Sequence, residues 1–311
     1  MSFSMEVKQE LFRVVPQARH CKIAELSALM AESGKIDIDK SGHLHIKLQT
    51  ESAYVARKCN LLFNRLCHLA PTVSVRTAKG KQKFAQYLIE IRGDAEVKKV
   101  LELLKLKVSG KDGQLMADGM VVVHTCCKRA FLRGAFLASG SVSNPQKSYH
   151  FEISEQEKGR AEQLVTLIRS FDVDAKPIVR KNYHVVYVKE GAQVAELLNI
   201  MEAHVALMEF ENVRIVKDVR NSVNRQVNCE TANLSKTVNA ARKQYEDIVL
   251  IRDSVGLQAL SENLEEVAKL RLEYPEASLI ELGEMLSPKL GKSGVNHRLK
   301  KISEYAESLR G

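Results

Sequence analysis

The sequence predicts an α+β fold made of two similar halves, followed by an all-α domain with a basic end. Three observations lead to this fold class. An apolar helical segment that ends in Ser-Gly occurs twice. The segments after each copy alternate in the same order between strand-like and helix-like spacing. Beyond about residue 246 the spacing is helical only. A chain of 311 residues has room for two or three domains with cores of their own.

The duplicated helix is the first of these features. Its upstream copy, AELSALMAESGKI, covers residues 24–36, and its downstream copy, KRAFLRGAFLASGSV, covers residues 128–142. The final glycines of the two helices, Gly34 and Gly140, lie 140 − 34 = 106 residues apart. Small residues four positions apart form a flat strip on which two helix backbones can approach closely. Both copies have such a pair, Ala24 with Ala28 and Gly134 with Ala138, so we expect the two helices to pack together.

The duplication continues after the helices. Each half reads helix, strand pair, helix, strand pair, helix, over residues 1–107 and 125–217. Coincidence between two amphipathic units is the alternative, but several matched segments in one order favour a true duplication. The matches are Leu44–Leu48 with Tyr149–Ile153, Asn60–Leu66 with Val165–Phe171, Leu88–Ile91 with Val185–Val188, and Val97–Leu104 with Val194–Met201.

The segment LRGAFLASG, residues 132–140, resembles the nine-residue signature of the LAGLIDADG homing endonucleases. In that family the signature helix packs against its twin, and the paired sheets form a saddle over DNA. The resemblance implies two αββαββα halves in residues 1–217, with a metal-binding Asp before the final glycine of each motif. Those positions hold Ser33 and Ser139 here. Glu32 is one residue out of register, which on a helix turns it by about 100°.

These substitutions argue against catalysis. A hydroxyl is a poor substitute for a carboxylate as a Mg²⁺ ligand, and two-metal cleavage needs carboxylates near both reacting oxygens. Ala138, the counterpart of Glu32 in the downstream copy, carries no charge. We therefore expect a retained endonuclease scaffold that is not an enzyme and has no catalytic residue.

Composition favours a polyanionic partner. The net charge is +9 and the isoelectric point is near 9.2. Trp is absent, which argues against broad base-stacking platforms. The amino-terminal segment carries Glu6 and Glu10 and lacks the apolar stretch of a signal peptide. No run approaches the length of a membrane span. We expect a cytoplasmic, nucleoid-associated protein with no membrane contact.

The cysteines do not have the spacing of a metal site. The chain has no C-x-x-C motif, whereas zinc ligands usually occur in closely spaced pairs. Cys126 and Cys127 together with His124 are the one group that could be imagined as ligands. We favour small buried thiols in a reducing cytosol, and we expect neither a metal nor a cofactor. The six cysteines are Cys21, Cys59, Cys67, Cys126, Cys127 and Cys229.

The chain changes character near Asp218. The segment from Asn221 to Asn239 is rich in Asn, Ser and Thr, so residues 218–245 are expected to form a linker and a connecting helix. Charge is sorted along the rest of the chain. Residues 244–287 have three basic and ten acidic residues, whereas residues 288–301 have five basic and no acidic residue. The basic end is thus a distinct patch.

That patch lies in an expected helix-turn-helix domain over residues 246–311. Leu264–Leu272 forms a helix that Pro275 stops, and Ser278 to Glu281 is a capping box that opens a second helix. A turn covers residues 287–292, and a third helix begins near Ser293. In this third helix Val295, Leu299 and Ile302 have core spacing. We also expect Gly283 to lie where two helices cross closely.

The opposite face of the third helix is suited to DNA. Asn can pair with adenine edges and Lys with guanine, while Arg suits phosphates. The alternative is a helical hairpin with an ordinary solvated basic face. The residues expected to contact DNA are Ser293, Asn296, His297, Arg298, Lys300 and Lys301 of the helix, with Lys289 and Lys292 of the turn.

The combination of a degenerate LAGLIDADG-like duplication and a carboxyl-terminal helix-turn-helix resembles the WhiA family of bacterial regulators. The segments LRGAFLASGSVSNP, RNSVNRQVNCETANLSKT and GKSGVNHRLKKI carry the resemblance. It implies a transcription regulator that acts in cell division, chromosome segregation or sporulation. The expected partner is double-stranded DNA, with other regulators or RNA polymerase as further candidates.

Two other functions are compatible with the residues. The duplicated domain could be a scaffold for a protein or a small ligand, with DNA binding confined to the carboxyl-terminal unit. A metal-dependent endonuclease is disfavoured by Ser33 and Ser139.

Overall fold

The computed structural model of the chain describes residues 2–39, 41–77, 85–109 and 113–310. It divides into two compact units, Met1–Lys217 and Asp218–Gly311. Each unit is described by itself.

The first unit contains the duplication that the sequence predicts. Both halves have the order αββαββα. The first half consists of α2 (Arg19–Ser33), β1 (Gly34–Ile38), β2 (Leu44–Thr50), α3 (Ala53–Cys67), β3 (Thr72–Thr77), β4 (Ala85–Arg92) and α4 (Asp94–Leu104). The second consists of α5 (Thr125–Ser139), β7 (Gly140–Val142), β8 (Phe151–Glu155), α6 (Lys158–Arg169), β9 (Lys176–Arg180), β10 (Tyr183–Val188) and α7 (Gly191–Ile200). The predicted fold class is confirmed.

The two sheets are antiparallel and begin in equivalent ways. The first strand of each sheet follows its signature helix directly and pairs with the next, with Gly34 opposite Leu48 and Gly140 opposite Ile153. The strand order is β7-β8-β10-β9 in the second sheet and β3-β4-β2-β1-β6-β5 in the first. The additional hairpin β5 (Leu106–Ser109) and β6 (Gln114–Ala117) widens the first sheet. Helix α1 (Phe3–Arg13) precedes both halves, and η1 (Gly119–Val122) leads into α5.

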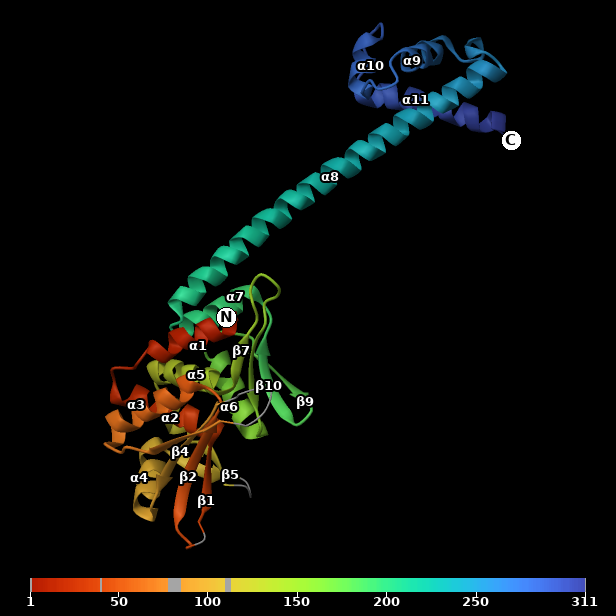
Figure 1. The fold of residues 1–311 in the computed structure, drawn as a ribbon. Coiled ribbons are helices and arrows are strands. Elements are labelled where there is room, and N and C mark those ends of the chain that lie inside the picture. Colours follow the sequence, from red (N-terminus) through yellow and green to blue (C-terminus); the bar gives the residue numbers. More distant parts are fainter. Residues whose placement is uncertain (1, 40, 78–84, 110–112, 311) are drawn as a thin grey trace. The chain divides into compact units, whose positions relative to one another are not determined.

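The signature helices α2 and α5 pack together as expected, side by side in Figure 1. A Cβ atom on Gly134 would lie 2.5 Å from the carbonyl oxygen of Glu25 and 2.9 Å from the Cβ of Ala28. Only glycine allows this approach. One continuous apolar core then joins both halves, and the stacked rings of Phe136 and Phe151 lie within it, 5.1 Å apart.

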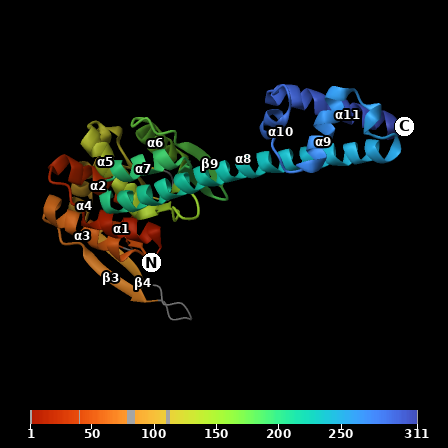
Figure 2. The ribbon, with the colours of Figure 1, turned by 90° about the horizontal axis from the view of Figure 1, so that it is seen from above.

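The second unit is helical. Its elements are the carboxyl-terminal part of α8 (His204–Ser254), η2 (Leu257–Ala259), α9 (Glu262–Glu273), α10 (Leu279–Met285) and α11 (Lys292–Arg310). Helices α9, α10 and α11 contact one another and are grouped in blue in Figure 2. They share a small core with Ile248 and Ile251 of α8.

The expectation of a linker over residues 221–239 is wrong, because α8 continues through it as one helix. The Asn, Ser and Thr residues lower helix propensity by only tenths of a kcal/mol each. No Gly or Pro interrupts residues 204–254. Side chains four residues apart also connect successive turns, as Gln226 does with Glu230 at 3.0 Å and Arg242 with Glu246 at 2.8 Å. Composition alone was a poor guide here.

Gly134→Ala tests the contact between the signature helices. The added methyl group would force the α2 and α5 backbones apart, so we expect a loss of about 1–3 kcal/mol in the free energy of unfolding. Urea denaturation of the full chain measures it. Gly159→Ala in α6 is the matched control, because its Cβ would meet nothing closer than 3.7 Å and should leave stability unchanged or slightly raised. Equal stability of the two variants would contradict the tight crossing.

Candidate nucleic-acid interface

The helix-turn-helix begins at the predicted capping box. The Ser278 hydroxyl accepts from the backbone N–H of Glu281, and the Glu281 carboxylate accepts from the backbone N–H of Ser278. These two bonds satisfy donors that a helix start leaves free. Gly283 lies at a close approach to both α11 and the turn before it, because a Cβ there would be 3.3 Å from Cγ2 of Val295 in α11. A Cβ there would be 2.0 Å from the carbonyl oxygen of Leu290, whose N–H donates to Gly283.

Helix α11 is held by the predicted core residues. Val295, Leu299 and Ile302 are all buried, as their spacing predicts. Arg271 of α9 is also buried, and it donates to the carbonyl oxygens of Pro275 and Ala277. It thereby fixes the connection between α9 and α10. Sequence reasoning missed this role, since an arginine in an acidic stretch looks like a surface residue.

The opposite face of α11 is open. Ser293, Asn296 and His297 are exposed, as are the lysines of the helix and the preceding turn: Lys289, Lys292, Lys300 and Lys301. Lys300 lies 3.8 Å from Glu304, a surface ion pair that is weak and easily exchanged for another anion. The polar and basic groups of the turn and α11 therefore share a solvent-facing surface.

Arg298 differs from the other members of the set. Its side chain is half-buried, and its guanidinium donates to the carbonyl oxygen of Asn263 at 3.1 Å. This contact ties α11 to the start of α9. Arg298 thus has a structural role within the unit that spacing on a helical wheel could not reveal.

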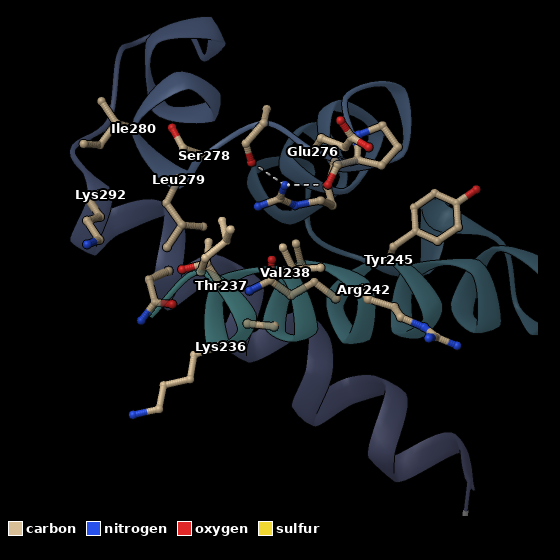
Figure 3. Close-up of a pocket in the computed structure, with 18 residues that line it drawn as sticks. Lys236, Thr237, Val238, Arg242, Tyr245, Glu276, Ser278, Leu279, Ile280 and Lys292 are labelled. Carbon is tan, nitrogen blue, oxygen red and sulfur yellow. Dashed lines mark hydrogen bonds between the residues drawn. The ribbon is translucent and has the colours of Figure 1, made fainter. Parts of the chain in front are cut away.

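A groove of about 860 Å³ adjoins the start of α11. Its walls come from α8, from α9 and its connection to α10, and from α10 and α11, all within the second unit. Figure 3 shows Leu279 of α10 facing Thr237 and Val238 of α8. Lys292 and Asn296 line the same groove. The segment that was expected to be a linker therefore borders the predicted base-reading residues.

The other candidate site lies at the carboxyl-terminal ends of α2 and α5, where the endonuclease acids would be. Ser139 donates from its hydroxyl to a carboxylate oxygen of Glu32 at 3.1 Å. Glu155, at the end of β8, is fully buried beside them. The guanidinium of Arg160 on α6 lies 3.1 Å from the carboxyl group of Glu155 and donates to the carbonyl oxygen of Ala31. Glu155 and Arg160 have no motif spacing, so the sequence did not indicate them.

Two carboxyl groups share one guanidinium in this cluster. Burial raises the pKa of Glu155 to about 11, and the neighbouring Glu32 adds to the shift. Burial also raises the pKa of Glu32. The proton of Glu155 and the charge of Arg160 therefore both reduce the negative charge of the pair. Glu155 is buried and Glu32 is half-buried. Raised pKa values beside an arginine make these carboxyl groups poor ligands for Mg²⁺, which requires ionised oxygens.

Three family models match the chain in sequence order. They are the WhiA N-terminal LAGLIDADG-like domain over residues 19–107, the WhiA LAGLIDADG-like domain over residues 128–220, and the WhiA C-terminal HTH domain over residues 223–306. The chain is also 50% identical over 313 residues to a probable cell division protein WhiA of Lachnoclostridium phytofermentans, with all of both chains covered. The chain belongs to the WhiA family.

Two further WhiA proteins support this. A probable cell division protein WhiA of Alkaliphilus oremlandii is 48% identical over 314 residues, which cover 100% of this chain and 98% of the relative. The crystal structure of full-length WhiA from Thermatoga maritima is 28% identical and covers 99% of both chains, with a TM-score of 0.60. The predicted family resemblance is confirmed. Among the described residues, no helix has both the length and the apolar character needed to cross a membrane.

Glu155→Gln tests the protonation of the carboxyl pair. In the unfolded chain this group ionises near pH 4.3, whereas the folded chain keeps its proton up to about pH 11. The unfolded state binds fewer protons between these values, so the group's contribution to the free energy of unfolding falls as pH rises. Gln carries no proton to release, and we expect a flatter pH dependence.

Denaturation of the wild type and Glu155→Gln across about pH 5 to 9 measures this slope. Glu162→Gln, an exposed acid on α6, is the control and should keep the wild-type slope. Identical slopes for all three proteins would show that Glu155 is ionised in the fold.

Proposed function

We propose that the chain is a sequence-specific, double-stranded DNA-binding transcription regulator without catalytic activity. The observation that carries this proposal is the open face of α11, where polar and basic side chains gather with no acidic residue between Pro288 and Lys301. The face is presented by a helix-turn-helix whose opposite side is buried. This is the geometry in which the second helix of the motif enters the major groove.

The proposed contacts divide by chemistry. Asn296 and His297 lie near the start of α11, the part of a recognition helix that usually reaches base edges. Ser293 and Lys300 share that face and would contact edges or nearby phosphates. Lys289, Lys292, Arg298 and Lys301 surround it and supply phosphate contacts, Arg298 through donors not used on Asn263.

The proposed cellular role follows from the relatives, which are named probable cell division proteins. We place the chain in the regulation of cell division, chromosome segregation or sporulation, acting in the cytoplasm at the nucleoid. Other regulators or RNA polymerase would be its protein partners. The duplicated domain would serve as a non-catalytic body, because Arg160 supplies the positive charge that a metal ion would otherwise bring to Glu32 and Glu155.

Asn296→Ala tests the assignment of the base-reading face. Losing a bidentate contact to a base should cost about 1–3 kcal/mol on the operator and much less on random DNA. Lys301→Ala should instead weaken both complexes similarly and lower the salt dependence by roughly one phosphate contact. Genome-wide mapping of bound sites supplies the operator. Affinities on operator and random duplexes across a salt series then provide the readout.

Lys269→Ala on α9 is the matched control, because it removes an exposed lysine outside the turn and α11. Thermal melts establish that each variant is folded. If Asn296→Ala loses equal affinity on both DNAs while it melts like the wild type, Asn296 contacts only the backbone. If both Asn296→Ala and Lys301→Ala bind DNA as tightly as the wild type, α11 does not recognise DNA.

The full chain should not cleave DNA with Mg²⁺ or Mn²⁺. The reason is the replacement of both motif acids by Ser33 and Ser139 and the neutralisation of Glu32 by its neighbours. Incubation with a randomised duplex library, followed by sequencing of new ends, measures cleavage. Metal-dependent ends that disappear in Glu32→Ala would restore the endonuclease hypothesis.

A further inference from the structure

A second cluster of chemically reactive side chains lies at the amino-terminal ends of α2 and α5. It consists of His20, Cys21, Cys126 and Cys127, named the thiol–histidine cluster below. Their four candidate ligand atoms all lie within 4.8 Å of one another. The Nδ1 atom of His20 is 3.1 Å from the sulfur of Cys127, 3.3 Å from that of Cys21 and 3.9 Å from that of Cys126.

These spacings are close to those of a filled tetrahedral site. Zinc binds sulfur at about 2.3 Å and nitrogen at about 2.0–2.1 Å, which places neighbouring ligand atoms roughly 3.5–3.8 Å apart. The distances from His20 span this range to within a few tenths of an ångström. Three cysteines and one histidine are a common ligand set of structural zinc sites.

The duplication explains how the cluster arises. Helices α2 and α5 begin 106 residues apart, and the same offset relates His20 to Cys126 and Cys21 to Cys127. Each half therefore contributes the same two positions of its signature helix. The two pairs meet because the helices pack against each other. The sequence argument against zinc depended on the absence of ligand pairs such as C-x-x-C along the chain. Here the ligands are instead brought together from the equivalent positions of the two repeats.

The surroundings act on the thiols in two directions. Burial raises the pKa of Cys21 to about 12 and also raises the pKa of Cys127, so a bound ion would have to displace their protons. The positions and charges around the cluster oppose this effect. All four residues lie in the first turns of α2 and α5, and the positive end of a helix dipole stabilises a thiolate. Arg19 and Lys22 flank one pair, and Lys128 and Arg129 follow the other. Cys21 and Cys127 are buried, with 7% and 3% of their surfaces exposed, whereas His20 and Cys126 are exposed. The cluster thus has two fixed inner ligands and an open side by which an ion can enter.

We propose that His20, Cys21, Cys126 and Cys127 bind one zinc ion, which clamps the two halves of the first unit together at the start of their signature helices. Four protein ligands complete the tetrahedron, so the ion has a structural role and no open position for catalysis. His124, considered as a ligand from the sequence, is the cap residue of α5 and lies beside the ring of His20, with 5.7 Å between the ring centroids.

Metal uptake by the full chain tests this proposal. Protein prepared metal-free under reducing conditions is titrated with Co²⁺, whose thiolate complexes absorb strongly, and then with Zn²⁺ as a competitor. We expect one ion per chain and a tetrahedral cobalt spectrum that zinc abolishes. Cys127→Ser and Cys126→Ser should each weaken binding by at least ~10-fold, because losing even a residue behind a ligand costs 10–100-fold.

Cys229→Ser is the matched control, because Cys229 is a cysteine of α8 outside the cluster. It should bind metal like the wild type. Cys126→Ser separates the loss of a metal ligand from misfolding, because Cys126 is exposed and its replacement leaves the buried core intact. Circular dichroism verifies that this variant is folded. A chelator should lower the melting temperature of the zinc-loaded wild type and of Cys229→Ser, but not that of Cys126→Ser.

Three outcomes would overturn the proposal. The folded, reduced wild type could show no cobalt–thiolate absorption. Binding could be unchanged in both Cys126→Ser and Cys127→Ser. Finally, protein prepared without reductant could contain a disulfide among the three cysteines and take up no metal after reduction, which would assign the cluster to thiol redox chemistry.

Discussion

The close contact between α2 and α5 is the constraint on which the first unit depends. Gly134 has no side chain, so the α5 backbone reaches Glu25 and Ala28 of α2 directly. The first strand of each sheet starts at the residue after its helix ends. The position of the two helices therefore sets where both sheets begin. A larger side chain at this crossing would move the two sheets as well as the helices.

Buried charges make the contact specific. Glu25 of α2 is fully buried between Lys58 of α3, at 3.0 Å, and Arg133 of α5, at 3.3 Å. Burial lowers the pKa of Lys58, which also donates to backbone carbonyls that include that of Leu11. Such ion pairs add little net stability, but removing one partner leaves an uncompensated charge and typically costs about 3–5 kcal/mol. We infer that they select one arrangement of α2, α3 and α5 rather than strengthen the core.

Local patterns in the sequence predicted most of the fold. The repeat order, the Ser278 capping box and the buried face of α11 depend on residues close together in the chain, and all three are present in the structure. Interactions between distant residues were missed. Glu155 and Arg160 meet Glu32 only after folding, as do the four members of the thiol–histidine cluster. The prediction of a linker over residues 221–239 failed for another reason. Low helix propensity does not end a helix that lacks Gly and Pro.

The two ends of the α2–α5 pair differ in the charge that they favour. A helix presents free carbonyl groups and partial negative charge at its carboxyl-terminal end, and free N–H groups and partial positive charge at its amino-terminal end. Arg160 donates to the carbonyl oxygen of Ala31 at the first kind of end, where the endonuclease fold would place metal-binding acids. The thiols of Cys21 and Cys127 lie at the second kind of end, where the partial positive charge opposes the rise in pKa that burial causes. The repeat relates α2 and α5, and the two helices pack together, so their equivalent ends lie close to each other. The partial charges of the two helix ends therefore add at each end of the pair. The scaffold can therefore hold the fixed cation of Arg160 at one end of the helix pair and, at the opposite end, gather ligands that a soft metal ion prefers.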